Sequence, residues 1–86
     1  MLLIWTEQAW EDFFVWQIQN DRKTILKINE LIKDISRNGL SQGIGHPEPL
    51  KQRKAWSRHI DHGNRFVYNF DEKQNLIIFS CKGHYD

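Results

Sequence analysis

Cysteine is almost absent from this chain of 86 residues, in which Cys81 is the only one. A single cysteine excludes an internal disulfide and a paired-cysteine metal site. Because Cys81 follows Phe79 and Ser80 in a strand-like run, we expect a small buried apolar residue rather than a nucleophile. The spacing of Asp, Glu and His is not typical of a metal site either, so we expect neither metal nor cofactor.

Long apolar runs are also missing. The apolar opening, Met1–Trp5, is too short for a signal peptide or a membrane span, and no positively charged segment precedes it. We therefore expect a cytoplasmic protein without membrane contact. The length predicts a single domain, residues 1–86, whose core must be efficient, and four Trp and five Phe supply material for it.

A charge excess of one sign is lacking as well, since the net charge is +1. The total charge therefore does not indicate a nucleic-acid binder. Its distribution is uneven: residues 44–70 hold five Lys or Arg against two Asp or Glu, and all four histidines lie in the second half. Scattered surface charge is the simplest interpretation, but a basic surface with histidines also suits a phosphate-containing partner.

Hydrophobic periodicity predicts a short strand at residues 2–5 and two helices. Thr6 is an N-cap for a helix over 7–19, and Asp21 is an N-cap for a helix over 22–37. In the first helix we expect one apolar stripe to pack in the core, formed by Trp10, Phe13, Phe14 and Ile18. In the second helix we expect the apolar face Ile25, Ile28, Leu31, Ile32 and Ile35, with polar residues including Asp34 facing water. The short connection predicts an antiparallel helical hairpin.

A loop over residues 40–54 follows, and loops this long in small domains are often functional. Pro47 and Pro49 stiffen the backbone on both sides of Glu48. A functional carboxylate and a rigid connector with an incidental glutamate are equally good interpretations of this segment alone.

Three strands are predicted over 55–60, 65–70 and 76–81, joined by turns rich in Asp, Asn and Gly. Alternation places Trp56, Arg58 and Ile60 on one face of the first of them. The pairing of the N-terminal strand is left open. The chain thus predicts an α+β fold with the order β-α-α-β-β-β, in which a helical hairpin packs on one face of an antiparallel sheet.

Polar residues gather around the ends of these strands. Arg58 and Arg65 lie on neighbouring strands, Glu48 lies on the loop before them, and His84-Tyr85 follows the last strand. Taken alone, the tail is best interpreted as a frayed polar terminus. Together, Glu48, Arg65 and His84 supply a base, a cation and an acid for attack of an RNA 2′-hydroxyl on its own phosphate.

These residues occur in an order and spacing that resemble the YoeB/Txe toxins of the RelE superfamily. The resemblance covers nearly the whole chain and rests on Ile4-Trp5-Thr6-Glu7, Lys27–Asp34, Pro47-Glu48-Pro49-Leu50-Lys51, Trp56-Ser57-Arg58, Arg65-Phe66-Val67-Tyr68 and Cys81 with His84-Tyr85. It implies a microbial-RNase-like, RelE-like fold. It also implies an mRNA interferase, a metal-independent endoribonuclease toxin that cleaves mRNA in the ribosomal A site and so inhibits translation.

The resemblance assigns roles to six residues. Glu48 is the general base, Arg65 the main phosphate cation and His84 the general acid, while Lys51 and Arg58 support the phosphate and Tyr85 positions the RNA. It implies a YefM-like antitoxin as partner, operator DNA only through the antitoxin complex, and homodimers. Because a carboxylate is a weak base at neutral pH, we expect little cleavage of RNA away from the ribosome.

Several positions depart from the family pattern. Arg58-His59 stands where two arginines are common, Asn64 where a histidine often precedes the arginine, and Gly83 where a larger residue is usual. Two alternatives stay open: a non-catalytic toxin of the ParE-like branch that inhibits a protein target, and an operon corepressor that acts only with its antitoxin.

Overall fold

A computed structural model describes residues 1–84 of the chain. The elements are β1 (Leu3–Trp5), α1 (Glu7–Ile18), α2 (Arg22–Asn38), β2 (Glu48–Pro49), β3 (Trp56–His59), β4 (Arg65–Phe70) and β5 (Leu76–Ser80). The α+β fold, both helices and the three predicted C-terminal strands are confirmed. The short strand β2 lies inside the segment for which only a loop was predicted.

The five strands form one sheet in the order β1-β5-β4-β3-β2. β2, β3, β4 and β5 pair antiparallel with their neighbours, whereas β1 pairs parallel with β5. The predicted antiparallel sheet is thus confirmed except at the edge formed by β1, whose pairing the sequence had left open. A parallel pair needs a long connection, and the helices and the meander between β1 and β5 provide it.

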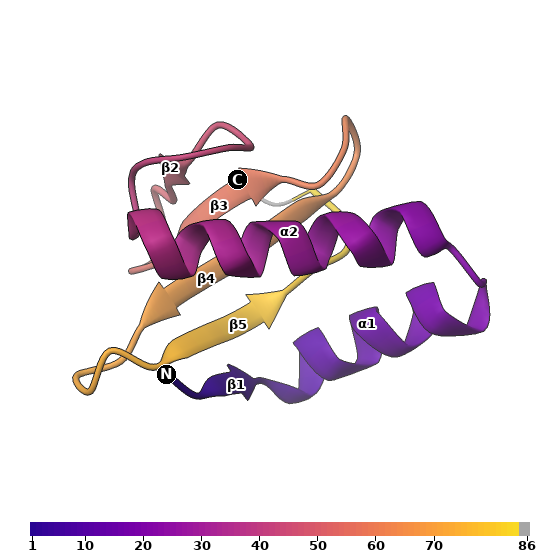
Figure 1. The fold of residues 1–86 in the computed structure, drawn as a ribbon, viewed down its shortest axis with the longest axis horizontal. Helices are drawn as coiled ribbons and strands as arrows, with labels where there is room; N and C mark the ends of the chain where they lie inside the picture. The colour runs from indigo at the N-terminus through magenta and orange to yellow at the C-terminus, as the bar shows by residue number, and fades with distance from the viewer. Residues whose placement is uncertain (85–86) are drawn as a thin grey trace.

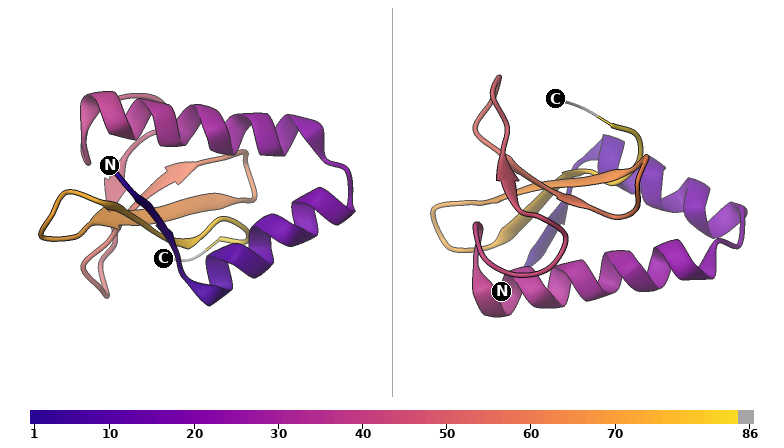
Figure 2. Two further views of the ribbon diagram at one scale, coloured as in Figure 1. Left: turned by 60° about the horizontal axis from the view of Figure 1, so that its bottom comes forward. Right: turned by 90° about the horizontal axis from the view of Figure 1, so that it is seen from above.

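The two helices form the predicted antiparallel hairpin on one side of the sheet (Figures 1 and 2). Thr6 accepts from the Ala9 amide and Asp21 from the Thr24 amide, which confirms both N-caps. Ile28, Leu31 and Ile35 of α2 are buried against Phe66, Tyr68 and Ile78 of the sheet. The predicted apolar face of α2 is thus confirmed. No helix within residues 1–84 is long and apolar enough to cross a membrane.

The predicted core stripe of α1 is confirmed only at Phe13, which packs against the core. Trp10, Phe14 and Ile18 are exposed by 53%, 52% and 67%. The buried residues of this helix are Ala9, Asp12 and Trp16. The Asp12 carboxylate accepts from the Cys81 amide and the Trp16 indole donates to the Cys81 carbonyl, so hydrogen bonds to the end of β5 select the inner face of α1.

Cys81 is buried, as expected from its position after a strand. Burial, aided by the neighbouring Asp12 carboxylate, raises the pKa of its thiol to about 12. A thiol with so high a pKa is inert as a nucleophile at neutral pH.

Arg58 occupies the core beneath the sheet, with 0% of its surface exposed. Its guanidinium forms an ion pair with Asp34 of α2, and its Nε donates to the hydroxyl of Tyr68. The remaining donors reach the backbone carbonyls of Gly39, Gln42 and Ile44. All five guanidinium N–H groups are therefore satisfied inside the protein.

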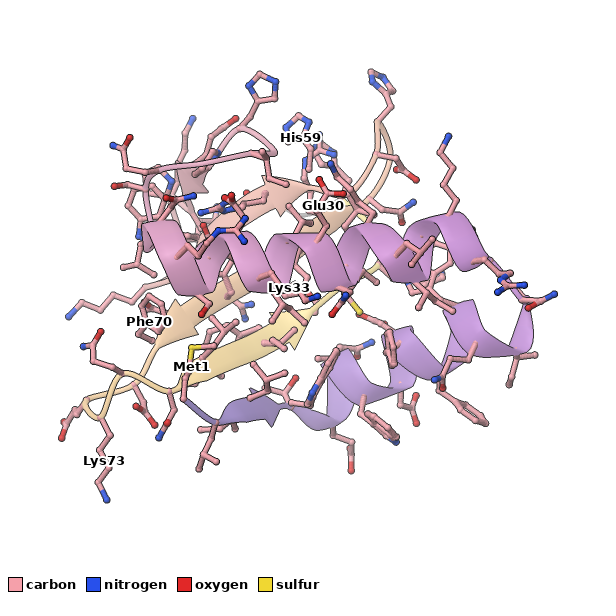
Figure 3. All side chains as sticks on the ribbon, viewed as in Figure 1. Met1, Glu30, Lys33, His59, Phe70 and Lys73 are labelled. Atoms are coloured by element: carbon pink, nitrogen blue, oxygen red, sulfur yellow. The ribbon has the colours of Figure 1, made fainter. Side chains whose placement is uncertain are left out.

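Asp34 is buried, so its predicted place on the water-facing side of α2 is wrong. Burial alone raises the pKa of a carboxyl, but hydrogen bonds from Arg58 and from the Ile44 amide hold the pKa of Asp34 below its usual value. Gly43 closes the loop over this pair with a φ of +119°, and a Cβ there would meet Asp34 Oδ2 at 1.8 Å. Figure 3 shows Glu30 and Lys33 labelled on the same helix.

Candidate functional site

The site lies on the sheet face that the helices leave uncovered. Arg58 and Phe66 point into the core, so the residues that alternate with them, Ser57, His59 and Arg65, belong to the opposite face. Figure 2 (right) shows the 50–54 loop and residues 81–84 on this same side, across the sheet from α2.

A hollow of about 460 Å³ opens on this face. Four of the predicted site residues line it together: Glu48, Lys51, Arg65 and His84. They come from β2, the following loop, the start of β4 and the segment after β5. Leu50, Gln52, Ser57 and His59 complete most of the wall. A carboxylate, two cations and an imidazole therefore surround one space large enough for a phosphodiester.

Backbone pairing fixes Glu48 at the rim of the hollow. It lies on β2 opposite Ser57, and Pro49 lies opposite Trp56. The loop after it is closed by the Leu50 amide, which donates to the Ala55 carbonyl at 2.9 Å. A short edge strand that follows Pro47 and ends at Pro49 thus presents the carboxylate from a stiff support.

Arg65 is held by the turn that precedes it. Its Nη1 donates to the carbonyls of Asp61, His62 and Asn64 at 3.0, 3.1 and 3.2 Å. Its Nε and Nη2 take no part in these bonds. Nη1 therefore anchors the side chain of a residue that lines the hollow.

His84 is positioned through the residue before it. The Gly83 amide donates to Asn64 Oδ1 at 2.8 Å, and the Arg65 amide donates to the Gly83 carbonyl at 2.9 Å. Asn64, noted in the sequence only as a departure from the family pattern, thereby fixes the segment of His84 to the strand of Arg65. Such a bond requires no sequence motif, so only the tertiary structure reveals it.

His59 is a member of the site that the sequence reasoning missed. It lines the hollow, and its ring centroid lies 5.3 Å from that of His46. Figure 3 shows its side chain labelled beyond α2, beside β3. Burial, and then the positive charges of Arg65 and His46, lower the pKa of His59 below its ordinary value. The signal was strand alternation, since the neighbour of a core-facing Arg58 must face outward.

We expect the His59→Arg variant to bind a phosphate-bearing ligand more tightly than the wild type. A depressed pKa keeps His59 uncharged at neutral pH, whereas arginine adds a permanent cation beside Arg65. One added phosphate contact steepens the dependence of log K on log salt by about 0.7 for a single strand. Titration of a short RNA at several salt concentrations measures this slope. His62→Arg is the matched control, because it adds the same charge on the exposed turn, and an equal gain there would contradict a role for His59.

One predicted substrate-binding residue among residues 1–84, Arg58, does not line the hollow. The prediction that Arg58 contacts the phosphate is wrong. Arg58 is completely buried, and its five internal hydrogen bonds leave no donor for a ligand. Tyr85 lies outside the described residues. Within residues 1–84, no three His, Cys, Asp or Glu side chains are grouped so as to hold a metal ion.

Comparisons with known proteins show the family to which this chain belongs. A family profile described as "YoeB-like toxin of bacterial type II toxin-antitoxin system" matches residues 5–85. Toxin YoeB of Escherichia coli K12 is 44% identical over 87 residues, covering 99% of this chain and 100% of that protein.

Two solved structures from Staphylococcus aureus share the fold. The YoeB dimer has a TM-score of 0.89 at 45% identity, covering 99% of this chain and 98% of that one. The YoeB–YefM complex has a TM-score of 0.88 at 45% identity, covering 99% of both chains. With the family profile spanning nearly its whole length, this chain belongs to the YoeB-like toxins of bacterial type II toxin–antitoxin systems.

Proposed function

We propose that this toxin is a ribosome-dependent mRNA endoribonuclease that cleaves mRNA in the ribosomal A site and so inhibits translation. The observation that carries the proposal is the hollow in which Glu48, Arg65 and His84 meet. A non-catalytic binder of the ParE-like kind has no need of a base, a cation and an acid around one space.

The proposed reaction is an internal transfer at phosphorus. Glu48 takes the proton of an RNA 2′-hydroxyl, whose oxygen forms a bond to the adjacent phosphorus while the bond from phosphorus to the 5′-oxygen breaks. His84 donates a proton to that leaving oxygen. Arg65 and Lys51 stabilise the additional negative charge on the phosphate oxygens. The products are a 2′,3′-cyclic phosphate, which water can open, and a 5′-hydroxyl end.

The shape of the site suggests why the ribosome is needed. Glu48, Lys51 and His84 are all exposed, so the hollow neither encloses a substrate nor holds it in line for attack. Alignment of the 2′-hydroxyl with phosphorus is worth many orders of magnitude in rate, and a ribosome that holds the mRNA supplies it.

The partner follows from the relatives. A Staphylococcus aureus relative is found in a YoeB–YefM complex, and another structure shows a YoeB dimer. We propose that a YefM-like antitoxin binds this chain and neutralises it, that operator DNA is contacted only through that complex, and that the chain forms homodimers. The expected site of action is the cytoplasm, where translation takes place.

Primer extension on mRNA tests the proposal. We expect cuts near the start codons of mRNA bound to purified ribosomes after addition of the wild-type protein, and little cutting of the same RNA without ribosomes. Growth arrest without any mRNA cleavage would instead support a non-catalytic toxin. Operator binding together with antitoxin, but without growth arrest, would support a corepressor.

A further inference from the structure

A second hollow adjoins the proposed catalytic one. Its volume is about 630 Å³, and its walls include Gln8, Arg53, Phe79 and Ser80. Leu50 and Gln52 line both hollows, so they form a common wall between the two. A ligand that extends beyond its reacting phosphate can therefore occupy both spaces.

The pairing of the strands places this second hollow in line with Glu48. Glu48 pairs with Ser57, Ser57 with Val67, and Val67 with Ser80. This row of backbone partners crosses four strands from Glu48 to Ser80, with a register shift in the β4–β5 pairing between Val67 and Tyr68. Three strand spacings separate them, or about 14 Å. The uncovered sheet face is in this way a continuous floor under both hollows.

The second hollow combines a stacking surface with positive charge. The Arg53 guanidinium lies 4.7 Å from the centroid of the Phe79 ring. Arg53 belongs to the segment Lys51–Lys54, in which three of four residues are cationic. Aromatic rings and arginine planes are the surfaces on which proteins stack the bases of single-stranded nucleic acid.

Two residues that line the second hollow have polar atoms without a hydrogen-bond partner within residues 1–84. Ser80 is only 4% exposed. Among the described residues, its Oγ is the only buried side-chain oxygen or nitrogen without a hydrogen-bond partner. A buried polar group without a hydrogen-bond partner is costly and uncommon in folded proteins. The Gln8 amide nitrogen is bound to Asp12, which fixes the side chain and leaves its oxygen for other partners. An amide group of this kind can recognise the edge of a base.

We propose that the second hollow binds the base of a nucleotide flanking the cleaved bond, stacked on the Arg53–Phe79 pair. This inference rests on the proposed ribonuclease function, because it assumes an RNA strand in the first hollow. The toxin then binds its substrate at two points, the phosphate beside Arg65 and the base beside Phe79. A base held there contributes to the choice of cleavage position.

The test uses ribosome-bound mRNAs in which either nucleotide next to the cleaved bond is replaced by an abasic one. For the wild type we expect one abasic position to lower kcat/KM about tenfold, as loss of one stacked base does. In Phe79→Leu, which keeps the apolar wall and removes the ring, that penalty should shrink below about threefold. Arg53→Ala should reduce it as well, and because Arg53 is exposed this variant is safe for folding.

Lys54→Ala is the matched control, since it removes the same charge from the same loop at a residue outside the hollow's lining. It should retain the full abasic penalty. Equal cleavage of intact and abasic mRNA by the wild type would overturn the base site while leaving the ribonuclease function standing. So would an undiminished penalty in both Phe79→Leu and Arg53→Ala. If the wild type did not cut any ribosome-bound mRNA, that result would instead contradict the proposed function itself.

Discussion

Replacement of Arg58 by alanine is expected to lower the free energy of unfolding by about 3–5 kcal/mol. The change leaves Asp34 as a buried carboxylate without its ionic partner, and it strips hydrogen bonds from Tyr68 and from three loop carbonyls. Domains of this size are stable by roughly 5–15 kcal/mol, so the loss removes a large part of the total. Urea unfolding followed by tryptophan fluorescence measures it.

Arg37→Ala is the matched control for the loss of an arginine beside Asp34. Arg37 also approaches Asp34, but its side chain is 70% exposed, and exposed pairs contribute about 0–1 kcal/mol. An Arg58→Ala variant as stable as the wild type but deficient in RNA binding would contradict the structural role. That result would instead support the sequence-based interpretation that Arg58 contacts the phosphate.

The free energy of unfolding at acidic pH should also depend on the ion pair between Asp34 and Arg58. Hydrogen bonds hold the pKa of folded Asp34 below its ordinary value of 3.8, so the unfolded chain binds more protons in this range. The contribution of Asp34 is therefore complete above about pH 4 and is lost as the pH falls towards its folded-state pKa.

Replacement of His84 or Glu48 by alanine is expected to lower the cleavage rate on ribosomes by about 10²–10⁴-fold each. Each change removes one partner of the proposed proton transfers, to the leaving 5′-oxygen or from the 2′-hydroxyl. Both side chains are exposed, so the unfolding free energy should change by less than about 0.5 kcal/mol. Primer extension with a time course on programmed ribosomes provides the rate.

His62→Ala and Glu72→Ala are suitable controls, because both residues lie on exposed turns outside the hollow. They should cleave like the wild type. Arg65→Ala is a less specific test, since Arg65 also holds the turn at residues 61–64. Growth arrest that survives both His84→Ala and Glu48→Ala would favour the non-catalytic alternative.

Two residues show why the site could be predicted only in part. Arg58 was expected to contact the phosphate because the family resemblance implied that role, yet its strand alternation with Trp56 and Ile60 already placed it on an apolar face. Asp34 similarly follows Leu31 by three residues on the apolar side of its helix. Two misplaced opposite charges in one small core indicate a buried pair, but a sequence does not show that they meet.

Helix α1 illustrates a second limit. Its aromatic residues have the spacing of one helical face. Nevertheless, more than half of the surface of Trp10 and of Phe14 is exposed. The inner face is chosen by Asp12 and Trp16, whose partners are backbone groups of Cys81, 65 or more positions away. Hydrophobic periodicity cannot register such bonds, because it weighs each side chain against its neighbours in sequence alone.

The sequence by itself determined the family and, apart from the short strand β2, the elements and their order, because caps, turn residues, periodicity and motif spacing are local properties of the chain. It also identified Glu48, Lys51, Arg65 and His84, which the fold brings into one hollow. Only the tertiary structure decided that Arg58 is a core residue, that Asn64 fixes the segment of His84, and that His59 faces the site. These assignments depend on burial and on hydrogen bonds between distant segments, and both exist only once the chain has folded.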